Sequence, residues 1–239
     1  MINKNNKIIA IMQPYFLPYM GYWQLMAQAD YFIVYDTIQF TKKGWINRNR
    51  FLKNGTDTRF SIPLKKDSNY LHVRDRFLAD VYDREKLIRQ FHGAYSKAPY
   101  FKNHFPLIDD IVRFDNNNLF NYIHNSICII HHFMGLESKI IKSSDIDAGS
   151  EDKKGRDRVI SLCKAMGATD YINPIGGVEL YDKQDFKNEG INLTFLRSIP
   201  LSYETLKGQK ALPHMSILDV MMFNDRDTIL TALKEFEWV

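Results

Sequence analysis

Two short apolar runs near the N-terminus constrain the fold of this chain more than any other feature. The run KIIAIM at residues 7–12 has the length and composition of a strand buried on both faces, and it ends at Gln13. The run YFIVYD at residues 31–36 has the same character. Between them, over residues 19–29, apolar residues recur at helical spacing. The pattern predicts a strand–helix–strand unit whose two strands are parallel and whose crossover is right-handed.

The rest of the chain alternates strands and helices in the same way. Further strands are predicted at 58–64, 139–144, 170–173 and 190–196, and helices at 83–95, 101–114, 119–134, 153–166, 216–224 and 227–236. Strands at both ends with helices between them favour an α/β fold, a Rossmann-like parallel sheet with helices on both faces. A helical insertion or cap is expected around 83–135. We expect one such domain over residues 1–239, and two smaller domains are the alternative.

Composition excludes several classes of protein. The chain is 45% hydrophobic and 25% charged, which is typical of globular proteins. A net charge of +4 is too small to indicate DNA binding, which shows a concentrated basic stripe. Cys128 and Cys163 lie in apolar helical patterns, so buried free thiols are expected. The sequence has no signal-peptide pattern and no apolar run of about 18 residues, so we expect a cytoplasmic protein without stable membrane insertion.

Polar side chains directly follow three of the predicted strands. Gln13, Asp36 and Asn173 stand at these positions. Parallel strands meet with their carboxyl ends at one edge of a sheet, which is where open α/β sheets bind ligands. We therefore expect the three side chains to lie on one rim, with Asp36 as a general base or an anchor for a substrate ammonium and with the two amides orienting the reacting groups.

The stretch DTIQFTKKGWINRNR, at residues 36–50, predicts an anion site next to this rim. Arginine suits bidentate recognition of phosphate, and lysine acts as a point charge. Trp45 can stack on a base or pack against a sugar. A solvated surface loop is the alternative. The residues assigned to substrate binding in this stretch are Gln39, Lys42, Lys43, Trp45, Asn47, Arg48, Asn49 and Arg50.

Glycines and helix starts supply further candidates for substrate binding. Gly21 lies at a predicted helix start, where backbone N–H groups and the helix dipole favour an anion. Gly176 and Gly177 allow close approach of the backbone after the predicted strand at 170–173. Lys154 and Arg156 begin a predicted helix, where the dipole disfavours cations, so they indicate an anionic partner. A proline-shaped turn around Gly21 and exposed loop lysines are the structural alternatives.

The histidines predict no metal site. His124, His131 and His132 have no Cys, Asp or Glu at a metal-ligand spacing. His92 is a candidate base by residue type alone. Ser216 follows His214 by two positions, but it begins an apolar helix, so we interpret it as a helix N-cap rather than a nucleophile.

The segment PYMGYWQL is similar to the P-H-x-G-H-x-x-L motif of the nucleotidylyltransferase superfamily, which includes pantothenate synthetase. In those enzymes the motif joins a strand to a helix and grips the phosphates of ATP. Tyr19 and Tyr22 occupy the two histidine positions here, and both are assigned to substrate binding. A tyrosine donates hydrogen bonds but does not carry the charge of an imidazolium, so this sequence departs from the motif where ATP is held.

A set of ordered motifs over nearly the whole chain resembles the WbqC-like family. These motifs are MQPYFLPYMGYWQL, ADYFIVYDTIQFTKKGWINRNR, YSKAPYF, GRDRVISLCKAMGATDYINPIGGVELYD and SILDVMMFN. The resemblance implies a cytoplasmic protein of surface-polysaccharide biosynthesis, especially of O-antigen and lipopolysaccharide. It also implies a reaction that joins an amino acid such as glycine to an amino sugar.

These observations combine into a functional hypothesis: a transferase that forms an amide on an amino-sugar nucleotide, as an N-acyltransferase or aminoacyltransferase. No cofactor is certain, and the candidates are ATP or an activated acyl donor, either an aminoacyl-tRNA or an acyl-thioester. A homodimer is one option for the assembly. A nucleotidylyltransferase and a non-catalytic sugar-nucleotide binding protein of the same pathway remain as alternatives.

Overall fold

The computed structural model describes residues 6–68, 70–149, 152–206 and 208–239. Within these residues one sheet of six strands has the order β5-β2-β1-β6-β7-β8. The first five strands of this order are parallel to their neighbours, and β8 is antiparallel to β7. Their bounds are β1 Ile8–Met12, β2 Tyr31–Val34, β5 Lys139–Lys142, β6 Asp170–Pro174, β7 Asn192–Ser198 and β8 Phe236–Trp238.

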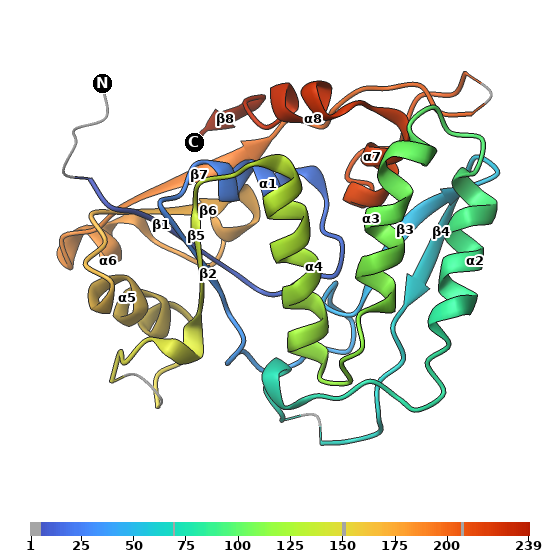
Figure 1. Cartoon of the computed structure of the whole chain (residues 1–239). Helices are drawn as coiled ribbons and strands as arrows, with labels where there is room; N and C mark the ends of the chain where they lie inside the picture. The colour runs from blue at the N-terminus through green and yellow to red at the C-terminus, as the bar shows by residue number, and fades with distance from the viewer. Residues whose placement is uncertain (1–5, 69, 150–151, 207) are drawn as a thin grey trace.

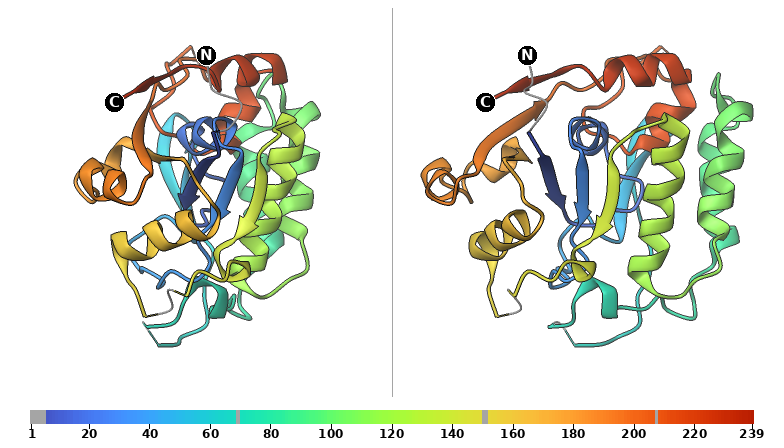
Figure 2. Two further views of the ribbon diagram at one scale, coloured as in Figure 1. Left: turned by 90° about the vertical axis from the view of Figure 1, so that its left-hand side faces the viewer. Right: turned by 60° about the vertical axis from the view of Figure 1, so that its left-hand side comes forward.

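Helices cover both faces of the sheet, as Figure 2 shows. On one face α5 (Gly155–Ala165) and α6 (Lys183–Asn188) pack with Ile9, Ile11 and Tyr171 in one apolar cluster. On the other face Ala10 and Phe32 join a larger cluster with α1 (Met20–Ala27), α4 (Leu119–Met134), α7 (Ile217–Phe223) and α8 (Arg226–Ala232). The alternation of neighbouring strand residues between the two clusters follows from the two-residue period of a strand. The predicted α/β fold with helices on both faces is therefore confirmed.

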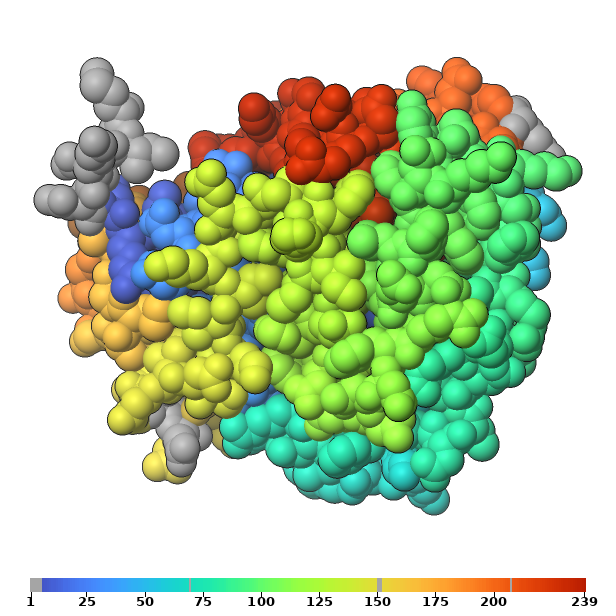
Figure 3. Space-filling model, viewed as in Figure 1, coloured from blue at the N-terminus to red at the C-terminus, as the bar shows by residue number. Residues whose placement is uncertain are grey.

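The chain between β2 and β5 holds the expected helices and one element that was not expected. Helices α2 (Arg84–Tyr95), α3 (Phe101–Arg113) and α4 lie where the periodicity predicts them, and α3 and α4 lie side by side on the face seen in Figure 3. Strands β3 (Arg48–Lys53) and β4 (Thr56–Ser61) form a separate two-stranded hairpin. These helices and the hairpin share the larger apolar cluster with the sheet.

The hairpin corrects two predictions. The strand predicted at 58–64 is not part of the main sheet, and the basic stretch is not wholly a loop, because β3 begins at Arg48. The missed signal is Asn54-Gly55, whose φ values of 54° and 81° suit the tight turn that this dipeptide favours. In this register Asn49 and Phe51 are buried, whereas the neighbouring Arg50 is partly exposed. Helix α6 and strand β8 are also absent from the predicted elements.

The strand order creates a switch point between β1 and β6. From β1 the chain proceeds through β2 to β5 on one side, and then returns to β6 and β7 on the other side. Connections therefore leave the carboxyl ends of the adjacent strands β1 and β6 in opposite directions, which opens a crevice in folds of this kind.

Candidate functional site

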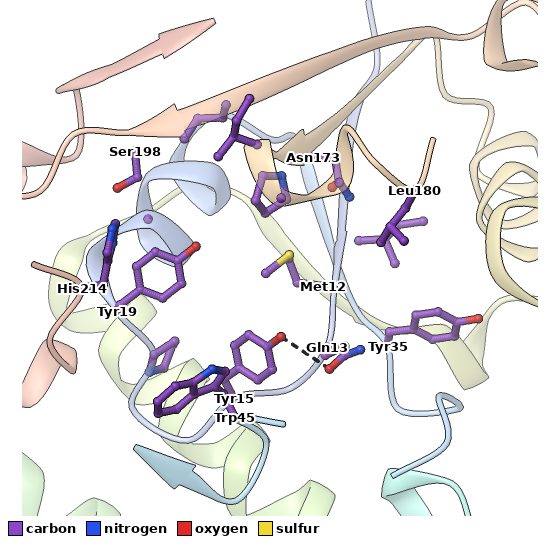
Figure 4. Close-up of a pocket in the computed structure, with 18 of the residues that line it drawn as sticks. Met12, Gln13, Tyr15, Tyr19, Tyr35, Trp45, Asn173, Leu180, Ser198 and His214 are labelled. Carbon is purple, nitrogen blue, oxygen red and sulfur yellow. Dashed lines mark hydrogen bonds between the residues drawn. The ribbon is translucent and has the colours of Figure 1, made fainter. Parts of the chain in front are cut away.

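A cavity of ≈ 1040 Å³ lies at this switch point. Its floor comes from the carboxyl ends of three strands, with Met12 at the end of β1, Gln13 directly after it, Asn173 in β6 and Ser198 at the end of β7. Figure 4 shows these side chains around one hollow, with Trp45 on the side opposite Asn173. Residues far apart in the sequence thus meet where an open parallel sheet binds its ligands.

The connection from β1 to α1 forms one wall of the cavity. Tyr15 and Tyr19 line it, and the hydroxyl of Tyr15 donates to Oε1 of Gln13 at 3.4 Å. Leu17 has a φ of 50°, which is uncommon for a bulky residue. Asn49 fixes this turn, because its Nδ2 donates to the carbonyl oxygens of Phe16 at 3.1 Å and Leu17 at 2.6 Å. The wall is thus tied to the hairpin.

Asn173 is held at the end of β6 with one face toward the cavity. Its side chain is 7% exposed, and its Nδ2 donates to the hydroxyl of Tyr171 at 2.5 Å. A Cβ on Gly177 would lie 2.0 Å from Oδ1 of Asn173, so residue 177 must be glycine for Asn173 to keep this orientation. The Asn173 carboxamide thereby offers the cavity a fixed oxygen acceptor.

Gly21 permits a second close approach, between α1 and the end of β7. A Cβ at this position would meet the ring of Tyr19 at 2.5 Å and the Cβ of Ser198 at 2.8 Å. The glycine therefore brings α1 against Ser198, whose buried Oγ has no hydrogen-bond partner among the described residues. The neighbours of Gly21 are therefore protein side chains.

Four tyrosines give the cavity hydroxyl donors. Burial raises the pKa of Tyr15 to about 12, with a further contribution from Tyr19. Burial also raises the pKa of Tyr19, Tyr35 and Tyr181. At neutral pH these side chains stay protonated, so they donate hydrogen bonds and do not act as bases.

The charged residues that line the cavity are arginines. Within the described chain, Arg50 and Arg197 line it, and no Asp or Glu does. Arg50 forms an ion pair with Asp57 at 2.9 Å, and Arg197 forms one with Glu237 at 3.0 Å. The two carboxylate partners lie outside the lining. Gly155, the first residue of α5, also reaches the lining and adds the positive end of a helix dipole. The site therefore favours neutral or anionic ligands.

Trp45 stands at the cavity with cations around it. Its side chain is 41% exposed, and the guanidinium carbons of Arg48 and Arg59 lie 5.7 Å and 5.8 Å from its ring centroid. Arg59 also lies directly across the hairpin from Arg50. Like charges directly opposite on a hairpin are destabilising, so this arrangement fits a surface that binds an anion. We call Trp45, Arg48, Arg50 and Arg59 the arginine–tryptophan platform.

Asp36 does not line the cavity, although the sequence pattern assigns it to the same rim. Its carboxylate is buried and accepts hydrogen bonds from Ser143 Oγ at 2.7 Å and from the backbone N–H of Ser144 at 2.9 Å. These partners belong to η2 (Ser143–Asp145), which follows β5, the neighbour of β2 on the side away from β1. Asp36 therefore joins two strand ends and lies outside the cavity lining.

The other candidates divide between the cavity and the rest of the molecule. Those that line it are Gln13, Tyr19, Gly21, Trp45, Asn49, Arg50, Asn173, Gly176 and Gly177. Tyr22 is fully buried and donates to the Gln13 carbonyl, so the second motif tyrosine belongs to the core. Arg156 forms ion pairs with Asp157 and Asp185. Asp36, Tyr22, Gln39, Lys42, Lys43, Asn47, Arg48, Lys154 and Arg156 lie outside the lining.

Several lining residues were not predicted from the sequence, among them Ser198 and His214. Ser198 ends a strand, and only the structure brings it to β1 and α1. His214 lies beside Tyr19 and Ser198 in Figure 4. In the sequence His214 stands out only by its spacing from Ser216, which is confirmed as an N-cap because its side chain accepts from the N–H of Leu218 at 3.2 Å. No local pattern distinguishes His214 from a loop histidine.

In the parts of the chain that the structure describes, no cluster of three His, Cys, Asp or Glu side chains is arranged to hold a metal ion. Over the same residues, no helix is both long enough and apolar enough to cross a membrane. Cys128 and Cys163 are free thiols, and Cys163 is buried as expected, whereas Cys128 is half-buried.

The comparison with known families decides the identification. The sequence profile of the WbqC-like protein family matches residues 13–231. This chain belongs to the WbqC-like protein family. The match begins at Gln13, so it includes the ends of β6 and β7 at the cavity but not β1, Ile8–Met12.

A relative of this WbqC-like protein occurs in Mycobacterium tuberculosis. It is named Uncharacterized protein Rv1507c, and it is 28% identical over 228 residues, which cover 91% of this chain and 94% of that protein. No solved structure matches this chain. The resemblance to nucleotidylyltransferases receives no support from these matches, and Tyr22 lies where it cannot reach a ligand in the cavity.

Proposed function

We propose that this WbqC-like protein transfers an acyl or aminoacyl group to the amino group of a nucleotide-linked sugar. The observation that carries the proposal is the chemical difference between two sides of one cavity. Trp45 lies on the side opposite the neutral amide of Asn173 in Figure 4, and Arg50 lines the same cavity. A nucleotide-linked amino sugar has the matching parts, because its base and diphosphate are aromatic and anionic and its sugar is neutral apart from the amine.

The size of the cavity agrees with a ligand of this kind. Sites for drug-sized ligands usually enclose roughly 300–1,000 Å³. At ≈ 1040 Å³ this cavity has room for a sugar nucleotide together with the reactive end of an acyl donor. In the proposed complex the arginine–tryptophan platform binds the base and the phosphates, which suits the bidentate donors of arginine.

The amide groups of the strand ends orient the reacting sugar in this proposal. Amide formation requires the uncharged amine, and a carboxylate beside the amine would favour the ammonium form instead. The lining residues include no Asp or Glu within the described chain, whereas Gln13 and Asn173 supply neutral acceptors. Much of the rate enhancement then comes from positioning amine and acyl carbon together. Asp36 has no part in this version of the mechanism.

The pathway and the donor are assigned on family resemblance. On that ground we propose surface-polysaccharide biosynthesis, including O-antigen and lipopolysaccharide, in the cytoplasm. The donor is an acyl-thioester or an aminoacyl-tRNA, or an acyl group activated by ATP.

Mass spectrometry of amino-sugar nucleotides tests the proposed function. The protein is incubated with nucleotide-linked amino sugars and with each donor class in turn, namely acyl-thioesters, aminoacyl-tRNA, and amino acids with ATP. We expect a sugar nucleotide carrying one added acyl group. The variant Asn173→Ala should make less of it, whereas Asn188→Ala, an exposed asparagine on α6, should match the unsubstituted protein.

Two other results would contradict the proposal. Release of pyrophosphate without any acylated product would favour a nucleotidylyltransferase. A rise in melting temperature with the sugar nucleotide, but no product with any donor, would favour a non-catalytic binding protein.

A further inference from the structure

The proposed amide formation needs a group that accepts a proton from the amine, and few side chains at the cavity qualify. The lining tyrosines have raised pKa values because of burial, and arginines stay protonated. No carboxylate lines the cavity within the described residues. His214 is the remaining side chain of the described lining that is a proton acceptor by residue type.

The chain holds His214 in a strained backbone conformation at the cavity. Its φ is 56°, a region that a non-glycine residue rarely adopts. Strain of this kind persists where the surroundings fix it, and it is frequent at active sites. The ring of His214 meets the ring of Tyr19 edge to face, with 5.6 Å between centroids.

The chain is fixed to the cavity walls on both sides of His214. The carbonyl oxygen of Pro213 accepts a hydrogen bond from Arg50. On the other side, Ser216 Oγ donates to the carbonyl of Leu17 at 2.7 Å, and the N–H of Ile217 donates to the carbonyl of Pro18 at 3.0 Å. His214 is therefore presented to the cavity by an anchored segment, although its own side chain is exposed.

The titratable groups around His214 come from three elements. Tyr19 precedes α1, and Tyr203 lies on the segment that follows β7. From the hairpin come Arg50 on β3 and its ion-pair partner Asp57 on β4. The hydroxyl of Tyr203 donates to the buried carboxylate of Asp219 at 2.5 Å. Burial raises the pKa of Tyr203, so this side chain stays neutral. The unpartnered Oγ of Ser198 lies at the same corner of the cavity.

We propose that His214 is the general base of this WbqC-like protein. The inference rests on the proposed acyl transfer and adds the residue that moves the proton. It follows from the position of His214 at the cavity, its fixed and strained backbone, and the absence of another base among the described lining residues.

With an acyl-thioester as donor, the step balances as follows. The nitrogen of the sugar amine attacks the acyl carbon and forms the C–N bond, while its proton passes to the imidazole of His214. The carbonyl oxygen becomes an oxyanion. The C–S bond then breaks, and the proton moves from His214 to the departing sulfur. Amine and thioester thus give amide and thiol, and the histidine returns to its neutral form.

The variants His214→Asn and His214→Gly test this assignment. Asparagine and glycine both tolerate a positive φ, so the backbone is expected to keep its conformation. With a thioester donor and a nucleotide-linked amino sugar, we expect kcat to fall by roughly 10²–10⁴-fold while KM changes little. Added imidazole should restore part of the activity of His214→Gly. His132→Asn, at an exposed histidine on α4, is the matched control and should keep full activity.

The pH dependence and the melting temperature complete the experiment. We expect the rate of the unsubstituted protein to fall as the pH is lowered and the base is protonated, and we expect His214→Asn to lose this decline. Equal melting temperatures would show that the loss of activity is not a loss of fold. Unchanged kcat and an unchanged pH profile in His214→Asn would overturn the role of His214 and leave the acyl transfer standing. No amide product from the unsubstituted protein would instead overturn the acyl transfer, and the base with it.

Discussion

The side-chain nitrogen of Asn49 lies 2.6 Å from the backbone carbonyl oxygen of Leu17, a residue whose φ is 50°. The same nitrogen also donates to the Phe16 carbonyl, and Asn49 Oδ1 accepts from the N–H of Arg50 at 2.9 Å. Asn49 thus joins the hairpin to the strained turn that forms a wall of the cavity. Its amide is occupied by the protein's own backbone.

The variant Asn49→Ala is therefore expected to lose stability. Removal of the Asn49 carboxamide leaves the carbonyl groups of Phe16 and Leu17 without their donor, which lowers the free energy of unfolding by about 1–3 kcal/mol. Urea unfolding measures the difference, and Asn103→Ala, at an exposed position on α3, is the control. If the two variants unfold at the same urea concentration, Asn49 does not hold the turn.

Gly177→Ala should lower the melting temperature because a Cβ there would collide with Asn173. The predicted separation of 2.0 Å from Asn173 Oδ1 forces this side chain away from Tyr171. Gly176→Ala is the matched control, since no described atom lies within 4 Å of a Cβ at that position. Thermal unfolding of both variants distinguishes them, and equal melting temperatures would mean that Asn173 is free to move.

The buried carboxyl of Asp219 predicts a dependence of stability on pH. Burial raises the pKa of Asp219 above its ordinary value of 3.8, and the hydroxyls of Tyr95 and Tyr203, both 2.5 Å away, partly oppose this shift. Because the folded protein holds the proton more tightly, the contribution of Asp219 to the free energy of unfolding falls as the pH rises from 3.8 toward the raised pKa.

Comparison with Asp219→Asn isolates this effect. We expect the unfolding free energy of the unsubstituted protein, minus that of the variant, to decrease as the pH rises above about 4. Urea titrations at several pH values measure this difference, because other titrating groups cancel in the subtraction. A difference that stays constant, or increases, with pH would contradict the raised pKa.

The sequence predicts the sheet well because its strands are short, apolar and buried on both faces. The bounds of α4, Leu119–Met134, are those predicted, since Asn118 caps its start and Gly135 with a φ of 65° ends it. The hairpin was missed because β3 is polar on its outer face and reads as a loop. Its pairing with β4 and the burial of Phe51 show the strand, and Asn54-Gly55 is the turn signal that was missed.

The candidate site was predicted in part, and the failures have a common cause. Gln13 follows β1 and Asn173 lies near the end of the adjacent β6, so both reach the rim where the carboxyl ends of parallel strands meet, as the sequence predicts. Asp36 follows β2, which lies between β1 and β5, and its partner Ser143 is more than a hundred positions away in the sequence. A strand end alone does not show which neighbour its side chain will face. His214 and Ser198 reach the cavity only through tertiary packing.

Arg59→Gln should weaken binding of a nucleotide-linked amino sugar by about tenfold or more. A charge-assisted hydrogen bond of roughly 1.5–3 kcal/mol is lost if Arg59 contacts a phosphate in the arginine–tryptophan platform. Calorimetric titration measures the dissociation constant, with Arg89→Gln on the exposed face of α2 as the control. Equal constants for the two variants would remove Arg59 from the binding site.

A crystal structure of the protein soaked with a nucleotide-linked amino sugar tests the central claim most directly. The account predicts the sugar within hydrogen-bond distance of Asn173 Oδ1 with its amine toward His214, the base against Trp45 and the diphosphate near Arg50. A ligand bound elsewhere, or a cavity that stays empty at saturating ligand, would contradict it.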